Sequence, residues 1–121
     1  MKKSKEEITY EFFGIDPTKF YSGKFAGWSS APDYLATPKN QFDIEYDRAR
    51  FLVSNIAGDR ILDIGCGSAP YGNTIRRNTS VKEIYGVDLD TVCVDRARVS
   101  YDFASVFDLN SGLPFEDDYF D

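Results

Sequence analysis

The chain has 121 residues, two cysteines, no histidine and a formal net charge of −6. This length is enough for one domain with one hydrophobic core. The acidic balance disfavours unaided binding to nucleic acid or an anionic membrane, because clusters of Lys and Arg are needed to bind phosphate groups. The lack of histidine excludes a Ser-His-Asp triad, and Cys66 and Cys93 do not have the spacing of zinc ligands. We therefore expect no metal site.

The sequence has no run of about 18 apolar residues that would predict a membrane-spanning helix. Its charged N-terminus is not followed by the apolar segment of a signal peptide. A cytoplasmic protein that does not insert into a membrane is therefore expected.

Residues 1–36 are rich in aromatic side chains and are interrupted by glycine and proline. No helical or strand periodicity persists across them, so they are predicted to form an irregular arm. One interpretation is that the rings of this arm pack on the outside of the sheet. The remainder, residues 37–121, is predicted to be a separate but partial domain.

A helix is predicted from about residue 38 to residue 57. Thr37 is a suitable N-cap, and Pro38 suits the first helical position. Gly58 suits the left-handed position that ends many helices. Apolar residues recur on one face of this helix, which is expected to pack on a sheet: Phe42, Tyr46, Ala49, Val53 and Ile56.

The apolar run Ile61, Leu62 and Ile64 predicts a strand that is buried on both faces of a parallel sheet. The glycines after it, at positions 65 and 67, permit a sharp turn. Pro70 suits the first turn of a helix, so backbone N–H groups at the end of this loop are expected to be free to face a ligand.

Glycine-rich turns of this kind hold dinucleotides as well as other nucleosides. The third glycine of the dinucleotide pattern falls on Pro70, so that pattern fails here. The negative charge of Asp63 would repel a pyrophosphate, whereas it would attract an ammonium group and be compatible with a nearby sulfonium. The loop is therefore predicted to bind a ligand that carries positive charge.

A short helix over residues 71–78 and a strand over residues 83–88 are predicted to come next, with right-handed parallel pairing. Asp88 ends this strand, 21 residues after Gly67, close to the interval at which nucleoside-binding folds place an acid on the ribose hydroxyls. The alternative is that Asp88 caps the next helix, but Asp90 is better placed for that role.

A third strand is predicted over residues 103–107, with Asp108 directly after it. One interpretation of this aspartate is a turn cap, because aspartate side chains often bond to the backbone two residues further on.

Asp63-x-Gly65-x-Gly67 after an apolar strand resembles the first motif of the class I S-adenosylmethionine-dependent methyltransferases. The third glycine of that family's longer pattern is Ala69 here, so a slightly altered loop is expected. The segment from Asp108 through Leu113-Pro114-Phe115 to Asp121 is similar to the segment after the third strand in many of these enzymes.

The resemblance implies an α/β, Rossmann-like parallel sheet with flanking helices, with S-adenosylmethionine as cofactor and S-adenosylhomocysteine as product. It implies that Asp63 serves the amino end of the cofactor, that Asp88 holds the ribose and that Asp108 accepts from the adenine amino group. It also implies that the N-terminal arm closes over the cofactor. The positions expected to bind the cofactor are Asp63, Gly65, Cys66, Gly67, Asp88, Leu89, Asp108 and Leu109.

By the same resemblance, Phe120 and Asp121 are the entrance to a fourth strand, so the domain is expected to be truncated after its third strand. An uncovered edge of the first strand and an uncovered apolar sheet face should result, and the edge is expected to pair with a second copy as a homodimer. Cofactor binding without efficient turnover is expected.

The leading interpretation is methyl transfer to an unidentified acceptor, with this chain supplying the cofactor-binding half. No catalytic residue is identified. One alternative is a fragment of a nicotinamide-dependent (NAD-type) oxidoreductase, which Asp88 permits but Asp63 and Pro70 oppose. Another is a non-catalytic, Rossmann-like binding domain.

Overall fold

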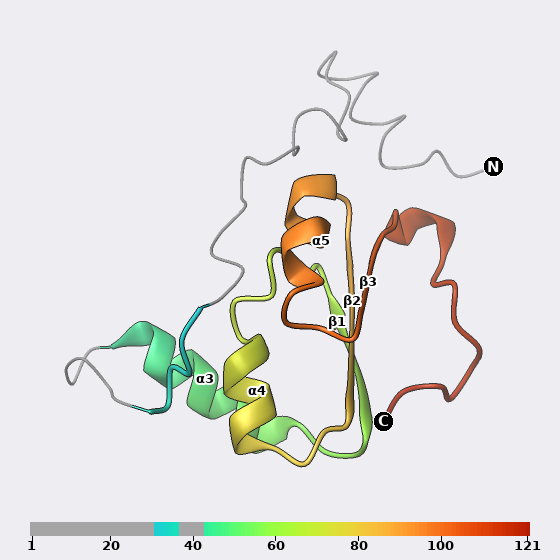
Figure 1. Ribbon diagram of the computed structural model, residues 1–121. Helices are drawn as coiled ribbons and strands as arrows, with labels where there is room; N and C mark the ends of the chain where they lie inside the picture. The colour runs from blue at the N-terminus through green and yellow to red at the C-terminus, as the bar shows by residue number, and fades with distance from the viewer. Residues whose placement is uncertain (1–30, 37–42) are drawn as a thin grey trace.

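The computed structural model describes residues 31–36 and 43–121 (Figure 1). Most of the predicted arm, residues 1–30, and the predicted helix start at Thr37-Pro38 lie outside these residues. The elements in chain order are α3 (Ile44–Asn55), β1 (Arg60–Ile64), α4 (Gly72–Asn78), β2 (Glu83–Asp88), α5 (Thr91–Ala97), β3 (Phe103–Val106) and a short 3-10 helix, η1 (Leu109–Ser111).

Helix α3 begins at an N-cap that was not predicted from the sequence. The Asp43 carboxylate accepts hydrogen bonds from the N–H groups of Glu45 and Tyr46, which would otherwise lack partners inside the helix. The helix ends at Asn55, two residues before the predicted end. Gly58 has the expected positive φ of 92°, but it lies in the turn into β1 and is not the cap of the helix.

The sheet has three parallel strands in the order β1-β2-β3, as the alternation of strands and helices predicted. The second strand has the predicted bounds, and the third ends one residue earlier than predicted, at Val106. Paired residues of neighbouring strands share a face, so Asp63, Gly86 and Ala104 lie in one row on the same side of the sheet.

The main core lies on that side, where α4 and α5 cover the sheet (Figure 1). Ile84, Val94 and Ala97 are fully buried there, and Leu52 and Ile56 from the α3 region pack against the core cluster to which these residues belong. Helix α3 packs mainly on α4, and its expected packing on the sheet itself stays a prediction.

The prediction that β1 is buried on both faces is wrong. Its residues are only partly buried, and Ile64 is 52% exposed. The reason is that β1 is the edge strand of this sheet, so its apolar side chains have a neighbouring strand on one side alone.

The opposite face of the sheet is covered in part by the C-terminal segment (Figure 1). Tyr85 is stacked on Phe103, with ring centroids 4.5 Å apart, and meets Phe115, Tyr119 and Phe120 edge-on. The expected uncovered face is thus found only in patches, since Ile64 and Phe103 are more than half exposed while Tyr85 is buried.

The last residue of the chain lies beside the start of β1. The Asp121 N–H donates to the Arg60 carbonyl at 2.9 Å, and the Asp121 carboxylate accepts from the N–H groups of Asp59 and Arg60. A side chain on Gly58 would collide with Asp121, at 2.2 Å between the two Cβ atoms, so glycine is needed there. This contact agrees with the expected start of a fourth strand at the edge of β1.

The described end of the arm, residues 31–36, packs on α4. The Tyr34 ring lies 5.3 Å from the Tyr71 ring, and the Tyr34 N–H donates to the Thr74 hydroxyl at 3.0 Å. Asn73 donates to the Ala31 carbonyl at 2.8 Å. The arm therefore reaches the helix that comes after the glycine loop, and this part of it does not lie on the outside of the sheet.

Candidate functional site

The loop between β1 and α4 turns at two glycines. Gly65 and Gly67 have φ values of 72° and 55°, which residues other than glycine rarely adopt. A Cβ atom on either glycine would meet nothing within 4 Å. The loop thus presents bare backbone to open space, which fits the close approach of a nucleoside ligand. Ala69 also has a positive φ, of 61°, so its methyl group does not move this position out of the left-handed region. The slightly altered loop expected from this alanine stays a prediction.

The N–H groups at the start of this loop are already bonded. Gly65 and Cys66 donate to the Val87 carbonyl at 2.8 and 3.1 Å, and Gly67 donates to the Asp88 carboxylate at 2.9 Å. These bonds tie the loop to the end of β2. At the end of the loop, where free N–H groups were expected, Ala69 donates to the Cys66 carbonyl at 3.0 Å and Gly72 donates to the Ala69 carbonyl at 3.1 Å, so the expectation is wrong for these two. Pro70 precedes α4, whose N-cap is Tyr71, and is not part of its first turn.

Asp88 joins the loop to the segment after β2. One of its carboxylate oxygens accepts from Gly67 and the other accepts from the Asp90 N–H at 2.9 Å. Each oxygen has two lone pairs, so both can accept a further bond from a ligand hydroxyl. The cap of α5 is Asp90, which accepts from Val92 and Cys93, and the alternative that Asp88 is that cap is therefore wrong.

Asp63 lies near the end of β1 and is partly buried. Burial raises the pKa of its carboxyl, and the charge of Asp88 raises it further, whereas a hydrogen bond from the Tyr101 hydroxyl at 2.5 Å acts in the opposite direction. Burial, together with the charges of Asp63 and Asp88, likewise raises the pKa of the Cys66 thiol to about 12. Asp63, Cys66 and Asp88 therefore share one electrostatic environment.

Asp108 lies just beyond the end of β3, which is separated from β1 by β2. Its carboxylate accepts from the backbone N–H and the side-chain amide of Asn110, at 2.9 and 3.0 Å, and caps η1. The turn-cap interpretation is thus confirmed. Leu109, the first residue of η1, is about half exposed, and Leu89 is partly buried beside Asp88.

The predicted residues are brought together to different degrees. Asp63, the glycine loop and Asp88 are linked by bonds or by charge, and Asp108 lies beyond the end of the third strand at the same edge of the sheet. Tyr101, the partner of Asp63, was not predicted from the sequence. No spacing rule signals it, since the two residues are 38 positions apart.

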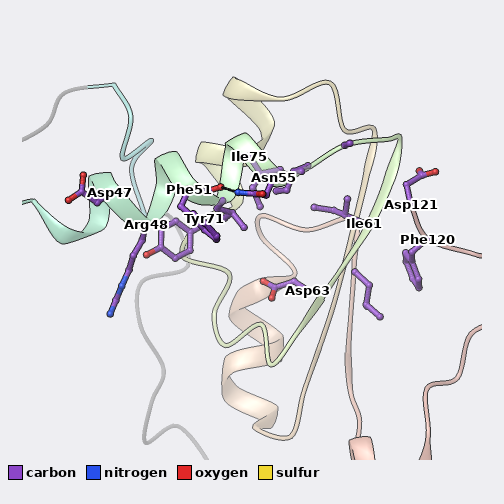
Figure 2. Close-up of a pocket in the computed structure, with 14 residues that line it drawn as sticks. Asp47, Arg48, Phe51, Asn55, Ile61, Asp63, Tyr71, Ile75, Phe120 and Asp121 are labelled. Carbon is purple, nitrogen blue, oxygen red and sulfur yellow. Dashed lines mark hydrogen bonds between the residues drawn. The ribbon is translucent and has the colours of Figure 1, made fainter.

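A groove of about 870 Å³ runs along β1, between α3, α4 and the C-terminal residues (Figure 2). Apolar side chains such as Phe51, Ile61 and Phe120 line it, and Asp63 is the one predicted site residue in its wall. The groove was not predicted from the sequence, because it depends on which strand forms the edge of the sheet.

Within residues 31–36 and 43–121, no group of three or more His, Cys, Asp or Glu side chains could hold a metal ion. In the same part of the chain, no helix has the length and apolar character needed to cross a membrane.

A family model described as a methyltransferase domain matches residues 62–121. Among solved structures, the chain is similar to geranyl diphosphate C-methyltransferase from Streptomyces coelicolor A3(2), solved with Mg²⁺, geranyl diphosphate and S-adenosyl-L-homocysteine. The identity is 18% and the TM-score 0.50, over 92% of this chain and 49% of that one. The [4+2]-cyclase SpnF has 23% identity and a TM-score of 0.49, over 84% of this chain and 39% of that one. A comparison with curated proteins gave no match.

The chain spans less than half the length of either structure. The matched segment begins inside β1 and includes the glycine loop, Asp88 and Asp108. The three parallel strands with helices on one face are the fold expected of the first half of such a domain. Residues 62–121 therefore belong to a methyltransferase domain, and the family match and the fold together support a class I S-adenosylmethionine-dependent methyltransferase.

Proposed function

We propose that this chain binds S-adenosylmethionine and supplies the cofactor-binding half of an enzyme that transfers its methyl group to an acceptor. The observation that carries the proposal is the bond from the Gly67 N–H to the Asp88 carboxylate, at 2.9 Å. This bond holds an open glycine turn and an acid at the end of β2 side by side, which suits a ligand with a ribose next to an amino-acid portion.

Each carboxylate has a proposed partner on the cofactor. Asp63 carries negative charge at the end of β1, just before the loop, and would attract the ammonium group. Asp88 would accept from two ribose hydroxyls, and Asp108 would accept from the adenine amino group. The other proposed contacts are Gly65, Cys66 and Gly67 around the amino-acid portion and Leu89 and Leu109 around the adenine ring.

The cofactor, when bound, supplies a methyl group that its sulfonium already activates. The residues of this chain would bind and orient it and would exclude water from the carboxyl edge of the sheet. No side chain is assigned as a general base, and the methyl acceptor is not assigned. Because the chain spans less than half of its structural neighbours, we expect binding with little turnover. A homodimer through the edge of β1 and a cytoplasmic location are further proposals, made from the sequence.

Calorimetric titration with S-adenosylhomocysteine and, separately, with NAD tests the proposal. We expect S-adenosylhomocysteine to bind and NAD to give no heat, because Asp63 would repel a pyrophosphate. Asp88→Asn should weaken binding about tenfold or more, as expected when a charged acceptor of hydroxyl groups is lost.

Asp95→Asn is the matched control, because Asp95 is an exposed carboxylate on α5 that, among the described residues, pairs with the nearby Arg98. It should bind like the parent chain. Tighter binding of NAD would favour an oxidoreductase fragment. No binding of either ligand by a folded chain would favour a non-catalytic domain.

A further inference from the structure

The Tyr101 side chain crosses β2 to reach β1. Its hydroxyl donates to the Asp63 carboxylate at 2.5 Å, and the residue is only 4% exposed. Gly86 is the residue of β2 that pairs with Asp63, and a Cβ atom there would lie 2.8 Å from Tyr101 Cδ2 and 2.8 Å from Cys66 Sγ. The ring therefore passes over β2 at the position that has no side chain.

The turn that carries Tyr101 is held on both sides. Arg76 of α4 donates to the Ser100 carbonyl at 2.8 Å and to the Asp102 carboxylate at 3.0 Å. Asp102 also exchanges two bonds with the backbone of Ile84, through its carboxylate at 2.8 Å and its N–H at 3.0 Å. Tyr101 is thus fixed between two anchored neighbours.

A second glycine makes room for this turn on the helix side. A Cβ atom on Gly72, the first residue of α4, would lie 2.6 Å from Ser100 Cβ. The turn is therefore enclosed between α4 and β2, and the direction of the Tyr101 hydroxyl is set by this packing.

We propose that Tyr101 is a positioning residue that fixes the Asp63 carboxylate toward the cationic end of the cofactor. This role rests on the proposed function. Tyr101 occupies one oxygen of Asp63 and leaves the other for a ligand ammonium group. The other titratable groups that act on this site are Asp88, which repels Asp63, the thiol of Cys66, which burial keeps protonated, and Arg76, whose positive charge acts on Tyr101.

The test uses two ligands and the variant Tyr101→Phe, which keeps the ring and removes the hydroxyl. S-adenosylhomocysteine carries the amino-acid portion, and 5′-methylthioadenosine lacks it. Loss of a hydrogen bond to a charged group should weaken binding of S-adenosylhomocysteine about tenfold and leave 5′-methylthioadenosine unchanged. Equal binding of S-adenosylhomocysteine by variant and parent, or an equal loss for both ligands, would overturn the positioning role.

Tyr85→Phe is the matched control, because Tyr85 is another buried tyrosine whose hydroxyl bonds to Tyr119, on the opposite face of the sheet. It should bind both ligands like the parent. In the variant that combines Tyr101→Phe with Asp63→Asn, the loss should be no greater than in Asp63→Asn alone, because the two residues act through one contact.

A measurement without ligand separates this inference from the proposed function. Carbon-13 NMR titration follows the Asp63 carboxyl directly, and Tyr101→Phe should raise its pKa, since the hydrogen bond favours the charged form. An unchanged titration in a folded variant would show that Tyr101 does not hold Asp63. The pKa of Asp63 could rise in the variant while the parent chain binds no S-adenosylhomocysteine. That result would support the contact between Tyr101 and Asp63, but it would contradict both the proposed function and the role of Tyr101 toward this cofactor.

Discussion

Asp63 is a carboxylate whose charge is disfavoured by its surroundings. Burial raises its pKa above the value in an unfolded chain, so the folded state binds this proton more tightly. The contribution of Asp63 to stability is therefore greatest at low pH and is lost as the pH rises through the raised pKa. A residue that only served the fold would rarely carry this penalty, which fits a binding role.

We predict that Asp63→Asn stabilises the folded chain at pH 7, because it removes a buried charge and keeps an acceptor for the Tyr101 hydroxyl. This gain in stability should disappear at pH values below the ordinary pKa of an aspartate, where Asp63 is protonated in both the folded and the unfolded state. Urea unfolding of both chains at several pH values measures this. A variant that is less stable than the parent at pH 7 would contradict it.

Gly86 is the residue that allows Tyr101 to cross the sheet. We predict that Gly86→Ala destabilises the fold by about 1–3 kcal/mol, because the new methyl group would overlap both Cys66 and Tyr101. Gly112→Ala is the control, since its Cβ would lie in open space and only its φ of 83° opposes the change, at roughly 1–2 kcal/mol.

Gly86→Ala and Gly112→Ala differ in a second readout. Gly86→Ala should also weaken binding of S-adenosylhomocysteine, whereas Gly112→Ala should not. Thermal unfolding and calorimetry on both variants check this. A Gly86→Ala chain that unfolds and binds like the parent would mean that the ring does not pass over β2 at this residue.

At the scale of elements, helices α3 and α5 both begin at an aspartate that accepts two backbone N–H bonds. Asp90 is 2% exposed, whereas Asp43 is only partly buried. We predict that Asp90→Ala costs about 2 kcal/mol and Asp43→Ala about 1 kcal/mol, because water can replace the cap only where it has access. Urea unfolding compares the two variants, and the reverse order of stabilities would show that burial does not decide the strength of these caps.

The bounds of several elements could be predicted because they depend on local signals. The β-branched and aromatic run of β2 and the Asp90 cap of α5 are visible in the sequence. The start of α3 was not predicted from Asp43, because Thr37-Pro38 is also a good cap by local criteria. Local signals locate an element, but several positions can satisfy the same signal.

At the scale of the whole molecule, the predictions from the sequence that were wrong concern contacts between residues distant in the chain. The apolar run of β1 indicated a strand, but its exposure depends on a neighbouring strand that the run does not specify. Two further contacts join segments that are far apart in the sequence. The C-terminal aromatic residues cover Tyr85, and the Tyr101 hydroxyl bonds to Asp63. Periodicity does not encode contacts of this kind.

The candidate site was predictable to the extent that it depends on strand order. Once β1, β2 and β3 are parallel, Asp63, Asp88 and Asp108 must lie toward the same edge of the sheet. Their side-chain partners were not predictable, since both oxygens of Asp88 bond to backbone groups and Asp108 caps a turn. The family's motif identifies the positions, and the packing determines how each one is held.

The central claim is that a nucleoside with a cationic end binds along the carboxyl edge of the three strands. Amide NMR of this chain during titration with S-adenosylhomocysteine tests it most directly. We predict saturable shifts at Gly65, Gly67, Asp88 and Asp108. Shifts confined to the groove along β1, at residues such as Phe51 and Asn55, or no saturable shift from a folded chain, would contradict it.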